Sequence, residues 1–100
     1  MQFVDLRESL KVQNVKTLSY EQNGNRLTAV FTIPNSALAL PDRLLKPSFD
    51  EALAGYGQKA FVRFEALLGL FLESWDLTIS DWDFESANVT RIKAVFDVRN

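Results

Sequence analysis

The chain has no cysteine and no histidine among its 100 residues. Without cysteine it has no disulfide and no thiolate ligand for a structural zinc ion. Histidine is the commonest general acid or base and cysteine the strongest natural nucleophile, so the usual means of catalysis are missing as well. We therefore expect a chain held together by its apolar core, without enzymatic activity, catalytic residue, metal or cofactor.

Signals for disorder, targeting and nucleic-acid binding are equally scarce. Only four glycines and three prolines are present, and no repeat or low-complexity stretch indicates a linker. Residues 1–100 are thus expected to fold as one domain. The basic residues are scattered singly in a chain of net charge -2, which disfavours nucleic acid as a partner. The first ten residues lack the basic and apolar regions of a secretory signal, so a cytoplasmic location is expected.

The most apolar segment is residues 59–73, KAFVRFEALLGLFLE. Arg63 and Glu65 are its only polar side chains between Phe61 and Leu72, so burying one face of a helix leaves apolar side chains uncovered. The run is shorter than the roughly 20 residues that a membrane span needs, so no membrane is expected as a partner. Cover for the other faces has to come from a sheet with its loops, from a second copy or from another protein.

Residues 14–33 read as a β-hairpin. The Asn23-Gly24 pair near its centre is the strongest short-range hairpin signal. A two-residue turn at this pair places Tyr20 opposite Leu27, with apolar side chains on one face and polar ones on the other. The same register places Leu18 on the apolar face. Turn chemistry and side-chain alternation therefore agree on one pairing.

A long helix is expected between this hairpin and the next. Ser48 and Glu51 form the pattern of a capping box, and apolar residues then recur at helical spacing. Gly55 and Gly57 weaken a helix by about 1 kcal/mol each relative to alanine. These features predict one kinked helix over about Phe49–Ser74.

Residues 75–98 predict a second hairpin. The apolar phase changes near Ser80-Asp81, which indicates a bulge in the first strand. A common apolar face then pairs Trp82 with Ile92 and requires a three-residue loop at residues 86–88.

Residues 1–13 precede these elements and are ambiguous between a strand beginning at Phe3 and a short helix, which we favour, with Asp5 as N-cap and Glu8 as its partner. The predicted fold is α+β. Two hairpins in ββαββ order form an antiparallel four-stranded sheet, and the long helix packs on one face of it.

The strand before the last turn is acidic, with Asp81, Asp83 and Glu85 on one face. Such a group could hold a hard cation or act as a general acid and base. The predicted register, however, places Asp83 opposite Arg91 and Asp81 opposite Lys93, so we favour a solvated face with ion pairs.

Apolar side chains outnumber the positions that one sheet and one helix can cover. The surplus lies in the 34–47 loop, which holds all three prolines, and on helix positions away from the main apolar stripe. Burying each such side chain gains roughly 1.5–3 kcal/mol. The loop leucines either pack as a lid over the core or join an interface with a second copy or a protein partner. The candidate interface comprises Leu38, Leu40, Leu44, Leu45, Phe61, Leu68, Leu70 and Leu72.

A group of aromatic residues allows another interpretation. Tyr20, Trp75, Trp82 and Phe84 are either core residues, interface anchors or a wall on which a ligand stacks. The candidate small-molecule pocket between helix and sheet is lined by Tyr20, Phe64, Trp75 and Trp82. The preferred function is an oligomeric protein–protein interaction module. A small-molecule-binding domain is the alternative, and an enzyme acting through the acidic strand ranks third.

Two further stretches carry a family resemblance. One is the extended segment Val30-Phe31-Thr32-Ile33-Pro34, and the other is Ala66-Leu67-Leu68 running on to Ser74-Trp75-Asp76-Leu77-Thr78. In both, the chain resembles the small tail assembly proteins of long-tailed bacteriophages, particularly the tail assembly chaperones. The resemblance implies a non-enzymatic protein that covers an apolar segment of a tail component until assembly. It implies no functional residue.

Overall fold

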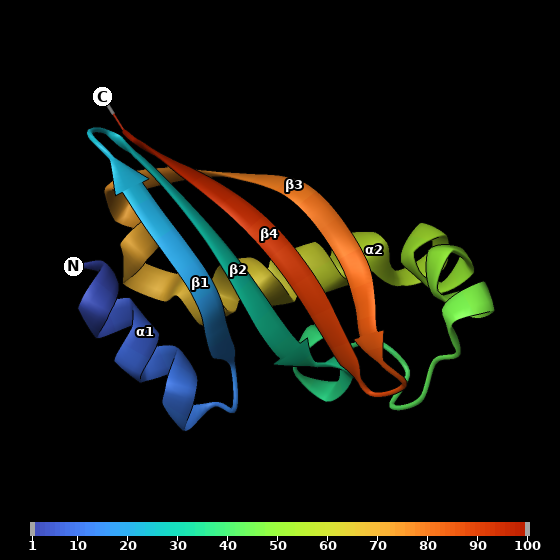
Figure 1. Cartoon of the computed structure of the whole chain (residues 1–100). Helices are drawn as coiled ribbons and strands as arrows, with labels where there is room; N and C mark the ends of the chain where they lie inside the picture. The colour runs from blue at the N-terminus through green and yellow to red at the C-terminus, as the bar shows by residue number, and fades with distance from the viewer. Residues whose placement is uncertain (1, 100) are drawn as a thin grey trace.

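One antiparallel sheet and two α-helices account for most of residues 2–99, the part of the chain that the computed structural model describes. The strand order is β1-β2-β4-β3 (Figure 1). The predicted α+β class, with two hairpins, a four-stranded sheet and one long helix, is confirmed. Along the chain the elements are α1 (Phe3–Val12), β1 (Lys16–Asn23), β2 (Arg26–Pro34), the 3₁₀ turn η1 (Asn35–Leu38), α2 (Lys46–Leu68), the 3₁₀ segment η2 (Gly69–Glu73), β3 (Trp75–Ser86) and β4 (Val89–Val98).

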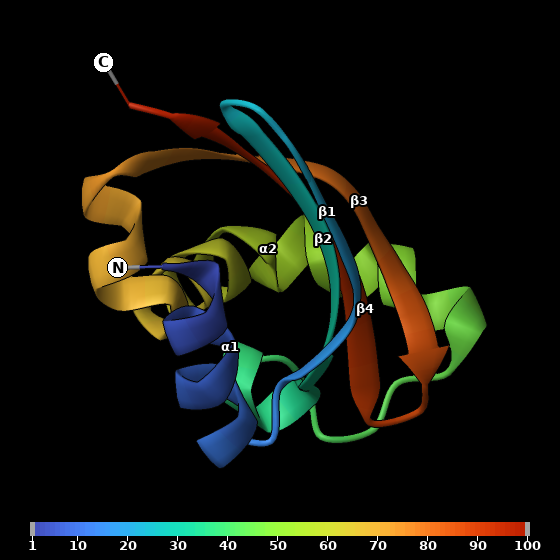
Figure 2. The ribbon, with the colours of Figure 1, turned by 60° about the vertical axis from the view of Figure 1, so that its left-hand side comes forward.

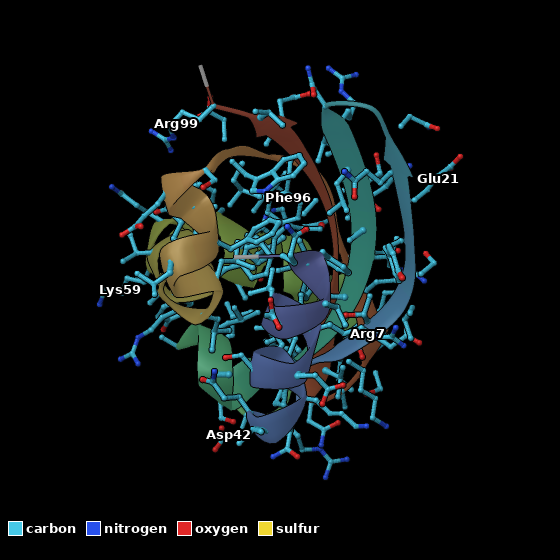
Figure 3. All side chains as sticks on the ribbon, turned by 90° about the vertical axis from the view of Figure 1, so that its left-hand side faces the viewer. Arg7, Glu21, Asp42, Lys59, Phe96 and Arg99 are labelled. Atoms are coloured by element: carbon cyan, nitrogen blue, oxygen red, sulfur yellow. The ribbon has the colours of Figure 1, made fainter. Side chains whose placement is uncertain are left out.

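Both helices cover the same face of the sheet, and within residues 2–99 no helix lies on the other face (Figure 2). The apolar core lies between these two layers, and Phe96 of β4 points into it (Figure 3). Its centre is aromatic. The rings of Phe31 and Phe64 lie 5.9 Å apart and those of Phe71 and Phe96 lie 5.1 Å apart, both in the edge-to-face geometry that aromatic pairs prefer.

The favoured interpretation of the N-terminal segment as a short helix is confirmed, but its start differs from the prediction. Gln2, rather than Asp5, is the N-cap residue. Asp5 lies at the third helical position, where its Oδ2 accepts a hydrogen bond from the backbone N–H of Gln2 at 3.3 Å. A carboxylate in the first turn also interacts favourably with the helix dipole.

The end of α1 has a Schellman-type cap. Asn14 adopts a left-handed conformation with φ of 63°. The N–H of Val15 then donates to the carbonyl of Leu10 at 3.0 Å, and the N–H of Asn14 donates to the carbonyl of Lys11 at 3.1 Å. This cap turns the chain into β1 while Leu10 and Val15 are both buried.

The first hairpin forms, but the predicted turn at Asn23-Gly24 is wrong by one residue. Asn23 pairs with Arg26, so Gly24 and Asn25 are the central turn residues. Gly24 has φ of 60°, whereas Asn25 is not in the positive-φ region. A glycine at the first central position is the pattern of a type II′ turn, which matches the twist of the strands.

The shifted turn changes the cross-strand partners of the β1 residues but leaves most of their side chains on the predicted face of the sheet. Tyr20 lies opposite Ala29, two residues from its predicted partner, so it still points toward the helices. The pairing is interrupted at Leu18 by a bulge, which places Thr17 opposite Phe31. The predicted apolar position of Leu18 is therefore wrong, and its side chain is 54% exposed.

The start of α2 also differs from the prediction, because the capping box at Ser48 does not form. The helix begins at Lys46 with Leu45 as N-cap, and Ser48 Oγ donates back to the carbonyl of Leu45 at 3.0 Å. Pro47 is tolerated in the first turn, where its missing N–H has no intrahelical partner to lose.

The helical conformation of α2 continues unbroken through Gly55 and Gly57. The α-helix ends instead at Gly69, whose φ of 52° lies in the region that favours glycine. No helix in the described residues is long and apolar enough to cross a membrane. In Figure 1, α2 crosses the strands, and its first turns extend beyond β3.

The second hairpin follows the predicted register. Trp82 pairs with Ile92, Phe84 pairs with Thr90, and the predicted bulge lies at Ser80. The alternation of apolar residues and its change of phase were therefore sufficient to define this pairing.

Only the turn of this hairpin departs from the prediction. Ser86 pairs with Val89, which leaves the two-residue turn Ala87-Asn88 instead of a three-residue loop. The extra residue is absorbed by a second bulge at Glu85. Asn88 consequently does not adopt the left-handed conformation that the longer loop requires.

Candidate functional site

Half of the candidate interface residues are buried within the chain itself. Leu38, Leu40 and Leu68 lie in the main core, and Leu44 packs with Phe49 in a smaller cluster at the start of α2. Leu38 and Leu40 therefore act as a lid over the main core, and Leu44 covers the smaller cluster. None of these four side chains contributes to an exposed surface in this conformation.

The other four candidate interface residues do not form one patch. Leu45, 68% exposed, precedes α2, whereas Leu70, 62% exposed, follows it. A helix of 23 residues spans about 35 Å, so these two leucines lie far apart. Phe61 and Leu72 are half-buried. The surface predicted from the sequence does not come together.

The candidate pocket residues are also separated. Tyr20 lies on β1 and Trp82 on β3, which are the two edge strands with β2 and β4 between them. Phe64 is completely buried, and Trp75 stacks on Phe71 with ring centroids 5.6 Å apart. These four aromatic residues belong to or border the core layer and do not share one cavity wall.

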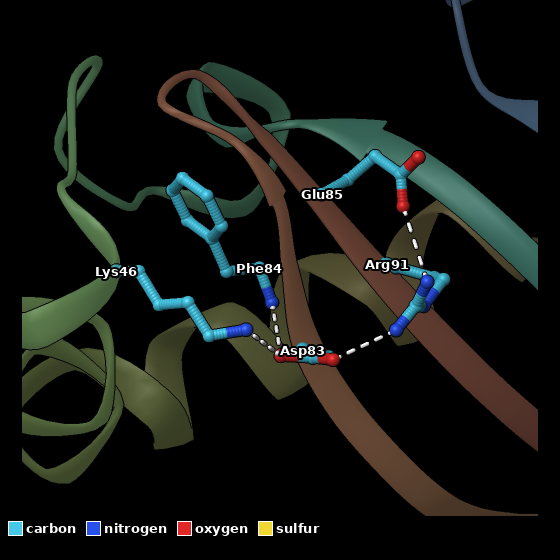
Figure 4. Close-up of polar contacts among 5 residues, drawn as sticks. All are labelled: Lys46, Asp83, Phe84, Glu85 and Arg91. Atoms are coloured by element: carbon cyan, nitrogen blue, oxygen red, sulfur yellow. Dashed lines mark hydrogen bonds and ion pairs between the residues drawn. The ribbon is translucent and has the colours of Figure 1, made fainter.

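Two of the three acidic strand residues, Asp83 and Glu85, form ion pairs at the open face of the sheet, and Asp81 forms none within the described residues (Figure 4). Asp83 Oδ2 lies 2.7 Å from Arg91 Nη2, and its Oδ1 lies 3.9 Å from Lys46 Nζ. Glu85 contacts the same arginine at 3.4 Å. The pKa of Asp83 is lowered, chiefly because the Phe84 backbone N–H donates to Oδ1 at 2.7 Å; burial partly opposes this, and the two cations lower it further.

This arrangement matches the favoured interpretation of a charged, solvated face. Asp81 lies opposite Lys93 and Asp83 opposite Arg91, as predicted. Exposed pairs of this kind contribute only about 0–1 kcal/mol each. Across residues 2–99, no three acidic side chains are grouped so that they could hold a metal ion.

A different surface emerges on the side of α2 that points away from the sheet. Gly55, Lys59, Val62 and Ala66 follow one another at helical spacing, and we call them the outward face of α2. Val62 is 56% exposed, whereas Phe64, two residues on, is completely buried on the opposite side. Lys59 extends away from the sheet in Figure 3.

The helix contains two glycines that its own packing does not require. Apart from the neighbouring backbone of the helix itself, a Cβ added at Gly55 or Gly57 meets no atom of residues 2–99 within 4 Å. Each glycine nevertheless weakens the helix by about 1 kcal/mol relative to alanine. Gly55 also borders a shallow hollow between α2 and Ala39, with Val62 in its lining. An intramolecular reason for Gly55 is therefore missing.

Sequence reasoning identified the glycines as weak points but did not include Val62 in the candidate interface. The signal was present, because two residues along a helix correspond to a rotation of roughly 200°. Val62 and Phe64 therefore cannot both face the sheet.

Comparisons with known proteins do not extend this assignment. No family model, curated protein or solved structure matches the chain.

Proposed function

We propose that this chain is a non-enzymatic protein–protein interaction module, and that a second copy of the chain binds the outward face of α2. The observation that supports this proposal is Gly55, a helix-interior glycine with empty space around it, beside the exposed Val62. Glycine permits another backbone to approach closely, and this gain offsets its unfavourable effect on the helix.

The outward face is complementary to itself when Glu65, which is half-buried, and Gly69, which directly follows α2, are included with it. In a two-fold symmetric pair of antiparallel α2 helices centred on Val62, residues equally far before and after Val62 face each other. Lys59 lies three residues before Val62 and Glu65 three residues after it. Each Lys59 would thus face Glu65 of the other copy, and each Gly55 would face Gly69. Opposite charges and small residues meet across this interface.

A different protein is the competing occupant of the same surface. The resemblance to tail assembly chaperones implies an apolar segment of a tail component as the partner. Such a partner would not require the chain to associate with itself. A dimer in solution would therefore support a second copy as the occupant, and a monomer would support a different protein.

Light scattering after size-exclusion chromatography, over a range of chain concentrations, tests self-association. We expect a concentration-dependent dimer that Val62→Asp shifts to monomer. Val4→Asp is the matched control, because Val4 is similarly exposed but lies on α1. Both changes should alter folding stability by no more than about 0.5 kcal/mol. A chain that is monomeric throughout, or a dimer that tolerates Val62→Asp, would contradict the proposal.

A charge exchange tests the antiparallel arrangement. Lys59→Glu alone or Glu65→Lys alone places like charges opposite each other at two symmetric positions. Each should weaken dimerisation by about 1 kcal/mol, given the size of exposed pair energies. The double variant restores opposite charges and should recover the dimer. Failure of the double variant to recover it would exclude this arrangement.

The glycines provide a test that separates stability from association. Gly55→Ala and Gly57→Ala should each stabilise the folded monomer by about 1 kcal/mol. Only Gly55→Ala should weaken the dimer, because Gly55 lies on the outward face and Gly57 does not. Equal dimerisation by the two variants would remove the argument from close approach.

A further inference from the structure

A cavity of about 540 Å³ lies between the last turns of α1 and the edge strand β1. Its volume is within the range of small-molecule sites. It is separate from the outward face of α2, since Arg7 in its wall and Lys59 on α2 lie on opposite sides of the molecule in Figure 3. Nothing in the proposed dimer uses this cavity.

The ionisable lining of this cavity is mostly basic. Arg7 and Lys11 come from α1 and Lys16 from β1, and Glu8 is the one acid beside them. None of the three cations is within ion-pair distance of a carboxylate in the described chain. By contrast, the arginines of β2 and β4 both contact carboxylates. The cavity thus brings together three positive charges that the fold leaves unneutralised.

An unpaired hydroxyl lies in the same wall. Thr17 Oγ1 is buried and has no hydrogen-bond partner within the described chain. Buried polar atoms in folded proteins nearly always have a partner. The β-bulge at Leu18 is what places Thr17 opposite Phe31 and beside the cavity. The hydroxyl of Thr17 therefore keeps a donor that no group of the described chain uses.

Arg7 is held in place by an aromatic contact. Its Cζ lies 5.7 Å from the centre of the Tyr20 ring, and Tyr20 in turn lies 4.8 Å from the ring of Phe3. A guanidinium over an aromatic face retains its planar fork of donors, which suits carboxylate and phosphate oxygens. The contact with Tyr20 orients this group without neutralising it.

We infer that this cavity binds a small anion that carries a phosphate or carboxylate group. Arg7, Lys11 and Lys16 supply the charge, and the hydroxyl of Thr17 donates one hydrogen bond. The carboxylate of Glu8 and the partial negative charge at the C-terminal end of α1 both oppose binding of an anion. Binding therefore favours a compact anion that contacts several of these donors at once.

Titration of the ¹⁵N-labelled chain with inorganic phosphate and, separately, with citrate tests this inference. Ionic strength is held constant with chloride, so that general screening does not change during the titration. We expect saturable shifts confined to the amides of the α1–β1 region, including Thr17 and Leu18. The anion with the lower dissociation constant identifies the preferred group. Shifts that do not saturate, or that spread over the other basic side chains, would overturn the inference.

Variants separate a site from general electrostatic attraction. Arg7→Gln and Lys16→Gln should each weaken binding about tenfold, the size expected for a lost charge-assisted hydrogen bond. Lys93→Gln makes the same charge change on the open sheet face and should leave affinity unchanged. Equal losses in all three variants would contradict a site at this cavity.

The role of Thr17 is tested without a change in charge. Thr17→Val should weaken binding about fivefold, because it removes the hydroxyl but keeps the shape. Thr17→Ser retains the hydroxyl and should retain affinity, which guards against a purely structural effect. If Thr17→Val binds the anion as tightly as Thr17→Ser, the hydroxyl of Thr17 does not contribute to binding.

Discussion

Thr90 donates its hydroxyl to Asn35 Oδ1 across 2.8 Å, and both residues are buried. The amide of Asn35 also donates to the carbonyls of Pro41 at 3.1 Å and Ala87 at 3.4 Å. Its backbone N–H donates to the carbonyl of Asn88 at 2.9 Å. Asn35 therefore connects the segment after β2 to the turn of the second hairpin. This network closes the end of the sheet beneath the loop that leads to α2.

Thr90→Val is expected to destabilise the fold by about 1–3 kcal/mol. The substitution preserves the side-chain shape but leaves the buried Oδ1 of Asn35 without its donor. Urea unfolding measures the loss. Thr78→Val, on an exposed position of β3, is the control and should change stability by less than about 0.5 kcal/mol. Equal effects would show that the Asn35–Thr90 bond adds nothing to stability.

Acid should remove the contribution that ionised Asp83 makes to the stability of the fold. Its pKa is lowered in the folded chain, so the folded state binds the proton more weakly than the unfolded state. The stabilisation is complete above the unfolded pKa and is lost as the pH falls through the folded pKa. Thermal unfolding of the wild type and Asp83→Asn at successive pH values should show the wild type's advantage vanish in acid. A difference independent of pH would contradict this.

Alanine should have opposite effects at Gly57, inside α2, and at Gly69, which directly follows α2. Gly57 is in helical conformation, so Gly57→Ala should stabilise the monomer by about 1 kcal/mol. Gly69 has φ of 52°, so Gly69→Ala should cost about 1–3 kcal/mol. Neither added Cβ meets another atom within 4 Å, so the difference comes from backbone conformation alone. Chemical unfolding at low chain concentration gives both values, and effects of the same sign would exclude this explanation.

Phe64→Ala should remove the main anchor of α2 on the sheet. Its ring is completely buried against Phe31, so truncation leaves a cavity and should cost about 3–5 kcal/mol. Val4→Ala, on the exposed side of α1, should cost less than about 0.5 kcal/mol. Denaturant midpoints compare the two. A loss below 1 kcal/mol for Phe64→Ala would mean that α2 contributes little to the core.

The two hairpins differ in how well local sequence defined them. In the second, apolar phase and opposite charges restricted Trp82 and Asp83 to one partner each. In the first, Gly24 can form a two-residue turn with Asn23 or with Asn25. The two turns shift the pairing of β1 with β2 by two residues, so each side chain stays on the same face of the sheet. Local alternation cannot distinguish these two registers. The bulge at Leu18 likewise had no signal in the alternation of β1.

The sequence by itself determined the α+β class, the two hairpins, the long helix and the apolar face of most strands, because side-chain periodicity reports which way a residue points. Periodicity does not show which other segment of the chain packs against that residue. Burial of the loop leucines, exposure of Val62 and the pairing of Asn35 with Thr90, 55 residues apart, depend on contacts between distant segments. Only the tertiary structure decided these contacts, and only it brought three unpaired cations and Thr17 around one cavity.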